Sequence, residues 1–178
     1  MKTFIIFIRG VMPSGKNRVP MAALRTALQK SGLKNVRTYI QSGNVLAQSN
    51  LSAYRTEKLV HDVILKRFGG DLVIAARTPD QVRKILAGNP FPSSVSARTF
   101  FTLLTGKPDK QKVMELSRRD FRPDKIVISD GVVYLHCPIS YGKSKLNNNS
   151  IEKMLGISAT TRNFNTMTKL LELGNQNR

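Results

Sequence analysis

The order of hydrophobic periodicities is the feature that most constrains the fold, because one order of strands and helices occurs twice along the chain. In the first half, β-branched and alternating apolar residues predict strands at residues 3–9, 36–40, 44–48 and 72–76. Apolar residues at helical spacing predict helices at residues 20–31, 54–68 and 79–86. Pro20 suits a first helical turn, and Gly32 and Gly69 suit helix ends. The first half therefore reads βαββαβ, followed by one more helix.

The second half repeats this order. Strands are predicted at residues 98–104, 125–129, 132–136 and 159–162, and helices at residues 109–117, 150–155 and 165–173. The pair Asp130-Gly131 predicts a tight hairpin turn between the second and third of these strands. Asn149 is a candidate cap for the second helix, and Gly174 is the expected end of the last one.

These patterns predict an α+β protein built as a tandem duplication of two ferredoxin-like (βαββαβ) subdomains, each with an extra C-terminal helix. The predicted subdomains are residues 1–88 and residues 97–178. The connector between them, residues 89–96, is punctuated by Pro90 and Pro92. The two halves share few identical residues, so the repeat lies in the order of predicted strands and helices and not in residue identity.

Composition narrows the class of protein. The chain has 178 residues, of which 40% are hydrophobic, so it is long enough to bury a core. One cysteine, Cys137, cannot form an intrachain disulfide and fits a reducing compartment. No apolar run approaches the ~18 residues of a membrane helix, and the apolar start is interrupted at Arg9. We therefore expect a soluble, cytoplasmic protein without a membrane partner.

The charge is strongly positive and unevenly distributed. Lysine and arginine number 29 against 11 acidic residues, which gives a formal net charge of +18. Nine basic residues precede the first acid, Glu57. An unpaired basic surface attracts polyanions, because neutralising phosphates releases their counterions. The charge predicts a nucleic-acid partner, bound electrostatically and without sequence preference, or a phosphorylated small molecule; the alternative is that it serves solubility alone.

Residues 10–17 resemble the phosphate-binding loop G-x-x-x-x-G-K-[ST] and follow a strand. Asn17, however, replaces the hydroxyl residue that holds Mg²⁺ in that motif, and Pro13 removes a backbone donor. The next helix is expected near Pro20, which displaces its N-terminus from Lys16. We therefore expect no nucleotide hydrolysis by this loop. Asp130 is better explained by its turn than by a Walker B role.

The sequence gives little support for a nucleophilic site, a metal site or an RNA-stacking surface. His136 and Cys137 are neighbours at the end of a predicted strand, where successive side chains point to opposite faces, so they cannot form a nucleophilic pair. Two histidines and one cysteine make a zinc site improbable, and no other metal site or cofactor is indicated. His61 lies between apolar positions of the helix predicted at residues 54–68, and it is expected at the boundary between the buried and the exposed side of that helix. Phe4 and Phe7 fall on opposite faces of one strand, which does not suit an RNA-stacking platform.

Two polar clusters remain as candidate sites. The stronger one combines a basic loop with an expected helix start, where free N–H groups and a bidentate guanidinium suit an anion. Its predicted anion-binding residues are Lys143, Ser144, Lys145, Arg162, Asn163 and Asn165. The secondary candidates are Arg9, Lys16, Asn17, Gln41, Ser42 and Asn44. The alternative is that the Asn and Thr residues cap helices and turns while the lysines face water.

Several separated blocks of sequence resemble one known family. These blocks are Arg9-Gly10, Gly15-Lys16-Asn17, Val19-Pro20-Met21, Leu24, VRTYIQSGNV at residues 36–45, YGKSKL at residues 141–146 and ATTRNFNTMTKLLEL at residues 159–173. The family is the uncharacterised, mostly bacterial domain of unknown function 1697. The resemblance implies a cytosolic protein of two ferredoxin-like subdomains, and it supplies no catalytic residues.

Three functions therefore remain open at the level of sequence. The first is a non-enzymatic protein that binds an anionic partner, either nucleic acid or a phosphorylated ligand. The second is an enzyme that acts on a small phosphorylated or carboxylated substrate at the junction of the subdomains, with catalytic residues unknown. A structural or regulatory partner protein is a third possibility. The fold cannot choose among them, since ferredoxin-like units host many functions.

Overall fold

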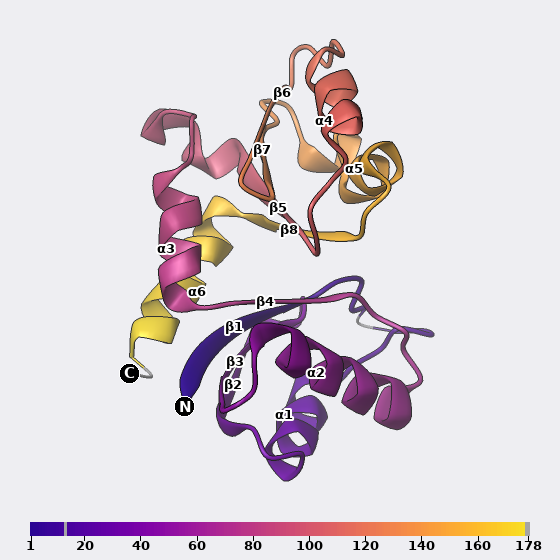
Figure 1. The fold of residues 1–178 in the computed structure, drawn as a ribbon, viewed down its shortest axis with the longest axis vertical. Helices are drawn as coiled ribbons and strands as arrows, with labels where there is room; N and C mark the ends of the chain where they lie inside the picture. Colours follow the sequence, from indigo (N-terminus) through magenta and orange to yellow (C-terminus); the bar gives the residue numbers. More distant parts are fainter. Residues whose placement is uncertain (13, 177–178) are drawn as a thin grey trace. The chain divides into compact units, whose positions relative to one another are not determined.

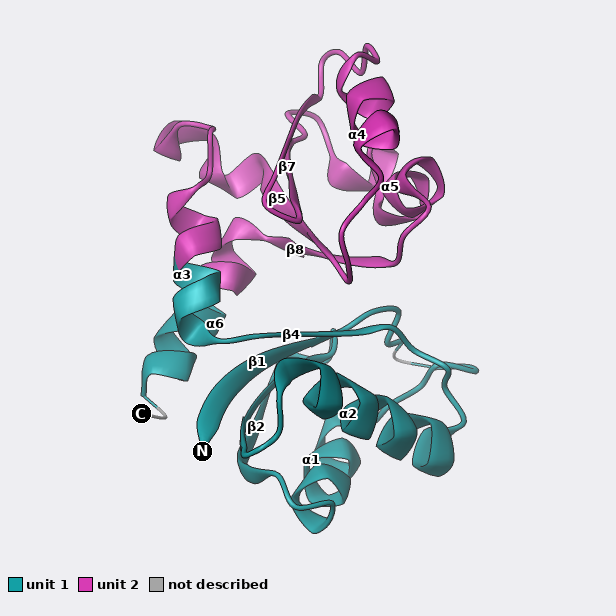
Figure 2. Ribbon diagram, in the orientation of Figure 1, with its two compact units in different colours: residues 1–83, 169–178 teal, residues 84–168 magenta. Residues whose placement is uncertain are grey.

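The computed structural model describes residues 1–12 and 14–176, so the expectation about Pro13 lies outside the described residues. The chain divides into two compact units, residues 1–83 with 169–178 and residues 84–168 (Figure 2). The division falls within helix α3 (Pro79–Ala87) and helix α6 (Phe164–Asn175). The subdomain bounds expected from the sequence, 1–88 and 97–178, stay a prediction.

The first unit contains a four-stranded antiparallel sheet in the order β2-β3-β1-β4. Its strands and helices are β1 (Lys2–Ile8), α1 (Met21–Lys30), β2 (Lys34–Tyr39), β3 (Asn44–Ser49), α2 (Ala53–Phe68) and β4 (Ile74–Arg77). Figure 1 shows α1 and α2 on the same face of this sheet. Phe4, Ile6 and Ile8 of β1 point to that face. They pack with Leu24 of α1 and Val60 of α2, which explains the helical spacing of those apolar residues.

The second unit has the same strand order, β6-β7-β5-β8, and is also antiparallel. Its elements are η1 (Ser93–Arg98), β5 (Thr99–Leu104), α4 (Lys110–Ser117), β6 (Lys125–Ser129), β7 (Val132–His136), η2 (Tyr141–Lys143), α5 (Asn148–Leu155) and β8 (Ala159–Asn163). Leu104, Leu135 and Ala159 of the sheet pack with Leu116 of α4 and Ile151 of α5. The predicted α+β class is confirmed, with two antiparallel sheets.

The predicted hairpin is present with its expected bounds. Strands β6 and β7 pair from Lys125 with His136 to Ser129 with Val132. Asp130 and Gly131 both have positive φ, 48° and 76°, as a tight two-residue hairpin turn requires. The prediction that Asp130 serves this turn is therefore confirmed.

Two helix ends differ from expectation. Helix α5 begins at Asn148, and Asn147, not Asn149, accepts the capping hydrogen bond from the Ser150 amide at 3.0 Å. Helix α6 runs through Gly174 to Asn175, so Gly174 does not end it. A side chain at Gly174 would meet Ile5 and Pro79 at 3.2 Å, so this glycine allows close packing inside the helix. No helix in the described part of the chain is long and apolar enough to cross a membrane.

Candidate functional site

The start of helix α6 holds three of the predicted anion-binding residues. Asn163 ends β8, and its side-chain oxygen accepts a hydrogen bond from the Thr166 amide at 2.8 Å. Asn163 is therefore an N-cap, and it satisfies one of the amides that an anion would use. Asn165 lies in the first helical turn and is exposed. Arg162 precedes the cap and pairs with Phe101 of β5.

Arg162 is partly buried and is attached to its own strand. Its Nη1 donates to the Thr160 hydroxyl at 2.9 Å and to the Thr161 carbonyl at 2.8 Å. Burial lowers the pKa of Arg162 to about 10, and the neighbouring Tyr141 opposes this shift. The guanidinium still carries its charge at neutral pH. A charge held in place at a helix start is a suitable anchor for a phosphate or carboxylate.

Ser144 is hydrogen-bonded to the carboxylate of Asp124. Its buried hydroxyl donates to Asp124 Oδ2 at 2.7 Å and accepts from the Leu146 amide at 2.8 Å. Lys143 and Lys145, on either side of it, are exposed. The structure thus directs Ser144 inward and leaves its two neighbours in solvent. The described contacts do not join the lysines to Arg162, so convergence of the three charges on one anion stays a prediction.

Cys137 lies beside the same serine. It is fully buried, and burial raises the pKa of its thiol although Ser144 partly offsets that effect. A raised pKa keeps the thiol protonated and poorly nucleophilic. His136 contacts the ring of Phe91 instead, with ring centroids 5.8 Å apart. Cys137 is therefore a residue of the second unit's core.

A chain of hydrogen bonds that the sequence analysis did not single out joins Thr102 of β5, Thr161 of β8 and Asn148 of α5. The Thr161 hydroxyl donates to Asn148 Oδ1 at 2.8 Å and lies 2.8 Å from the Thr102 hydroxyl. Tyr141 stacks on Phe100 with ring centroids 4.6 Å apart, and burial raises its pKa. The asparagine run at 147–149 was the available signal, but its spacing alone did not show which side chains turn inward.

The secondary candidates lie around the loop after β1 and the β2–β3 turn. Met12 donates its amide to the Asn17 carbonyl at 3.0 Å, which closes the loop upon itself. Helix α1 begins at Met21, so its N-terminus is displaced from Lys16, as expected. Within the described residues, the first amides of α1 are therefore displaced from Lys16, unlike the helix start that follows a nucleotide phosphate-binding loop. Lys16 is exposed, while Arg9 and Asn17 are partly buried.

The contacts described for the β2–β3 turn hold it in place within the first unit. The Gln41 amide donates to the Val19 carbonyl at 3.0 Å. The fully buried Asn44 donates to the Tyr39 carbonyl at 3.2 Å and to the Ser42 hydroxyl at 3.0 Å. Gly43 has φ +81°, and a Cβ there would lie 2.8 Å from the Ile8 carbonyl oxygen. Only glycine fits this approach, so the QSGN segment fastens the turn to the end of β1.

The first unit carries exposed Lys and Arg side chains on α1 and α2 that form no ion pair within the described residues. All five acids of this unit are paired internally: Glu57 with Arg77, Asp62 with Lys58 and His61, Asp71 with His61, Asp80 with Arg83, and Glu172 with Lys169. Five exposed cations of α1 and α2 form no ion pair within the described residues: Arg25, Lys30, Arg55, Lys66 and Arg67. We call these five the α1–α2 basic surface.

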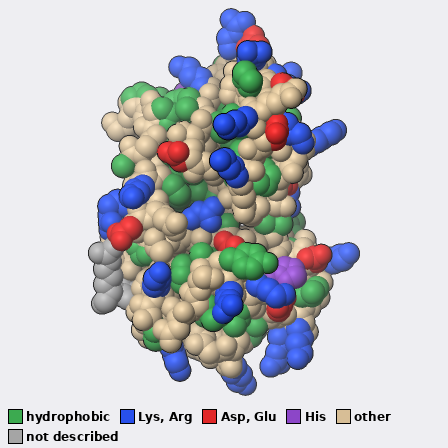
Figure 3. Space-filling view, in the orientation of Figure 1, with side chains coloured by type: hydrophobic (Ala, Val, Ile, Leu, Met, Phe, Trp, Pro, Cys, Tyr) green, Lys and Arg blue, Asp and Glu red, His purple; other side chains and the backbone are tan. Residues whose placement is uncertain are grey.

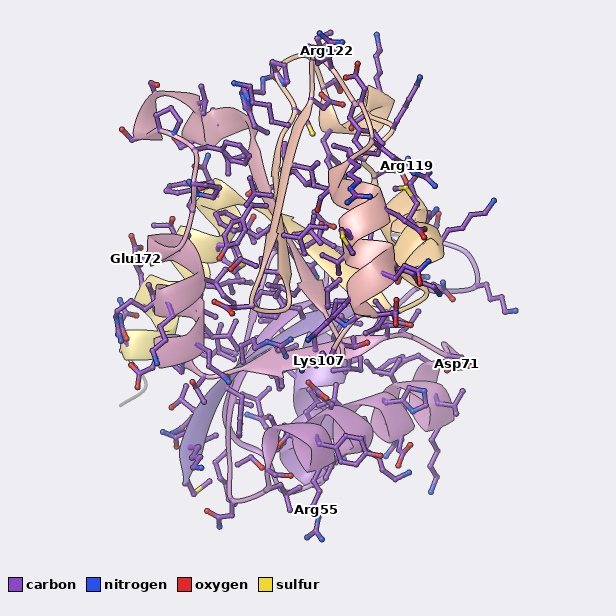
Figure 4. All side chains as sticks on the ribbon, turned by 45° about the horizontal axis from the view of Figure 1, so that its top comes forward. Arg55, Asp71, Lys107, Arg119, Arg122 and Glu172 are labelled. Carbon is purple, nitrogen blue, oxygen red and sulfur yellow. The ribbon has the colours of Figure 1, made fainter. Side chains whose placement is uncertain are left out.

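The figures agree with this excess of positive charge. Lys and Arg side chains clearly outnumber acidic ones on the face in Figure 3. Arg55 extends from α2 away from the ribbon in Figure 4. Because α1 and α2 cover one face of the first sheet with their apolar sides, their charged sides face outward together.

Comparison with solved structures supports the fold. The chain is similar to a conserved bacterial protein, SP0830 from Streptococcus pneumoniae, with a TM-score of 0.76 and 20% sequence identity. The similarity covers 97% of this chain and 98% of that chain. No curated protein matches the chain.

A family model places the chain more specifically. The model described as protein of unknown function, DUF1697, matches residues 1–134. The matched region holds the RG, GKN and QSGN segments, whereas the 141–146 and 159–173 blocks lie beyond it. Since the match extends over more than half of the sequence, this chain belongs to the DUF1697 family of proteins of unknown function.

Proposed function

We propose that this protein binds nucleic acid electrostatically, and that the α1–α2 basic surface is the principal contact. The observation that carries the proposal is the pairing pattern of the first unit: every acid is paired internally, whereas five helical cations form no ion pair with any residue that the structure describes. Free cations release phosphate counterions on binding, whereas paired ones must first break an ion pair. The proposal concerns phosphate recognition without base readout.

The placement of these cations suits an extended polyanion better than a small phosphate. They occur on two helices, and on α2 they run from the first turn to the last of a 16-residue helix. A helix of that length spans about 24 Å, which is several phosphates along a nucleic-acid strand. A single phosphorylated molecule would engage only one end of such a surface.

The test is fluorescence anisotropy with labelled duplex DNA and single-stranded RNA of mixed sequence. We expect weak binding to both at ~50 mM salt, with little sequence preference and a steep loss as salt rises. Absence of binding at that salt would remove the proposal, because the electrostatic contribution is largest there. A salt-insensitive affinity would also contradict it.

A matched pair of variants locates the surface. Replacing Arg55, Lys66 and Arg67 by glutamine removes three charges from α2, and replacing Lys110, Lys112 and Arg118 removes three from the region of α4. We expect the α2 variant to lose at least tenfold more affinity for duplex DNA than the α4 variant. The slope of log K against log[salt] should also become shallower by about 2 to 3 in the α2 variant. Equal losses would reject the surface. Thermal unfolding is measured in parallel, because Lys66 and Arg67 also complement the helix dipole.

We also propose that the two sheets arose by tandem duplication of a ferredoxin-like unit. The strand orders are equivalent, and each final strand carries an arginine followed at once by a helix cap. Arg77 precedes Thr78, which caps α3 through the Gln81 amide, and Arg162 precedes Asn163. Each arginine donates Nη1 to the carbonyl of the preceding residue.

A second correspondence supports the duplication. Glu57 is the fifth residue of α2 and accepts the Ala76 amide of β4 at 2.7 Å. Glu152 is the fifth residue of α5 and accepts the Ala159 amide of β8, also at 2.7 Å. A carboxylate at one helical position therefore binds the final strand in both halves.

A further inference from the structure

Strand β6 is an edge of the second sheet, and its side chains are incompletely covered. In the described part of the chain, the sheet order β6-β7-β5-β8 leaves one side of β6 without a strand neighbour. Lys125, Val127 and Ser129 are exposed, and Val127 exposes 39% of its surface. Ile126 and Ile128 point to the core and are only partly buried there. An edge with exposed apolar residues is a site where another strand can pair.

The edge strand β2 is protected, in contrast to β6. In β2 the register with β3 shifts between Lys34 and Arg37, and Asn35 has a positive φ of 49°. A bulge of this kind disrupts the row of hydrogen-bonding groups, and the two cations repel a second copy. Strand β6 pairs with β7 in an unbroken register over all five residues and carries one charge, Lys125. Its outer edge therefore remains regular.

The sequence of β6 is nearly symmetric about its central residue. It reads Lys125-Ile-Val-Ile-Ser129, so an antiparallel pairing of two copies about Val127 joins all five residues. In that register Val127 lies opposite its own copy, and Ile126 lies opposite Ile128. Lys125 lies opposite Ser129, so no like charges meet. Apolar residues therefore face apolar residues on both faces of the pair.

We propose that two copies of this chain associate through β6, joining their second sheets into one continuous antiparallel sheet. Pairing would satisfy the outer backbone groups of β6 and cover Val127 on one face and the isoleucines on the other. Repulsion between two molecules of net charge +18 opposes the association. Added salt screens that repulsion, so the dimer strengthens as salt rises. This inference is independent of nucleic-acid binding.

Substitutions at Ser129 test the register. Ser129→Glu places a carboxylate opposite Lys125 of the other copy, and Ser129→Lys places an ammonium there. Each dimer contains two such pairs, so we expect the dimer dissociation constant to fall about fivefold with glutamate and to rise about fivefold with lysine. The measurement is sedimentation velocity of the full chain over a concentration series at ~50 mM and ~500 mM salt.

The matched controls carry the same charge changes at Ser94, an exposed residue of η1. If the Ser94 variants shift the equilibrium as much as the Ser129 variants, net charge and not the register explains the effect, and the proposal fails. Val127→Lys should abolish the dimer, while Val127→Thr, which keeps a β-branched residue, should retain it. A wild-type chain that stays monomeric at ~500 mM salt and millimolar concentration would overturn the proposal outright. Circular dichroism verifies that each variant folds.

Discussion

Arg162 and Arg118 have the same charge but very different surroundings. Arg162 is held by Thr160 and Thr161 next to a capped helix start, whereas Arg118 is exposed at the end of α4. If the 143–145 loop and Arg162 share an anion, Arg162→Ala weakens pyrophosphate binding at least tenfold more than Arg118→Ala, since a fixed guanidinium binds phosphate bidentately. Isothermal titration calorimetry measures both. Equal affinities in the two variants would show that no such site exists, and Arg162→Lys should restore only part of the binding.

His61 predicts a pH dependence of stability. Its Nε2 lies 2.8 Å from Asp71 and its Nδ1 3.2 Å from Asp62, and both contacts raise the pKa of the imidazole in the folded state. The stabilisation is therefore complete below the unfolded pKa and is lost as pH rises through the folded pKa. Both carboxylates are exposed, so solvent screening keeps the effect small. Urea unfolding at a series of pH values should show the wild type losing stability relative to His61→Gln as pH rises above about 6.5, the ordinary pKa of imidazole; a difference that is constant with pH would refute this.

At the scale of elements, Glu57 and Glu152 each accept a backbone amide of the last strand in their half, β4 or β8, and each should stabilise that half. Glu57→Ala removes the carboxylate that accepts the Ala76 amide and also removes the ion pair between Glu57 and Arg77, so we expect a loss of about 1–3 kcal/mol in the free energy of unfolding. Burial raises the pKa of Glu57, which means that the charged form is disfavoured and that Glu57→Gln costs less than Glu57→Ala. Chemical unfolding at pH 7 measures these losses. Glu115→Ala, on the exposed side of α4, is the control, and a loss as large as that of Glu57→Ala would contradict the assignment.

The elements themselves were largely predictable, because local periodicity determines them. The β6–β7 hairpin follows from alternation around Asp130-Gly131, and α2 follows from apolar residues repeated at helical spacing. Helix ends were less predictable. Asn147 and Asn149 are chemically alike, and tertiary packing decides which one caps α5; Gly174 continues α6 because it packs against Ile5 and Pro79. The inward turn of Ser144 to Asp124 joins residues 20 positions apart, which no local pattern encodes.

At the scale of the whole molecule, salt should act in opposite directions on the two proposed interactions. Nucleic-acid affinity falls as salt rises because each released counterion gains less entropy in a more concentrated salt solution, whereas self-association strengthens because like charges are screened. Raising salt from ~50 to ~200 mM should therefore weaken DNA binding by at least tenfold while it lowers the dimer dissociation constant. Parallel anisotropy and sedimentation series measure the two trends. Salt trends of the same sign would mean that one of the two contacts is not governed by the net charge of +18, and the Ser129 and α2 variants identify which one.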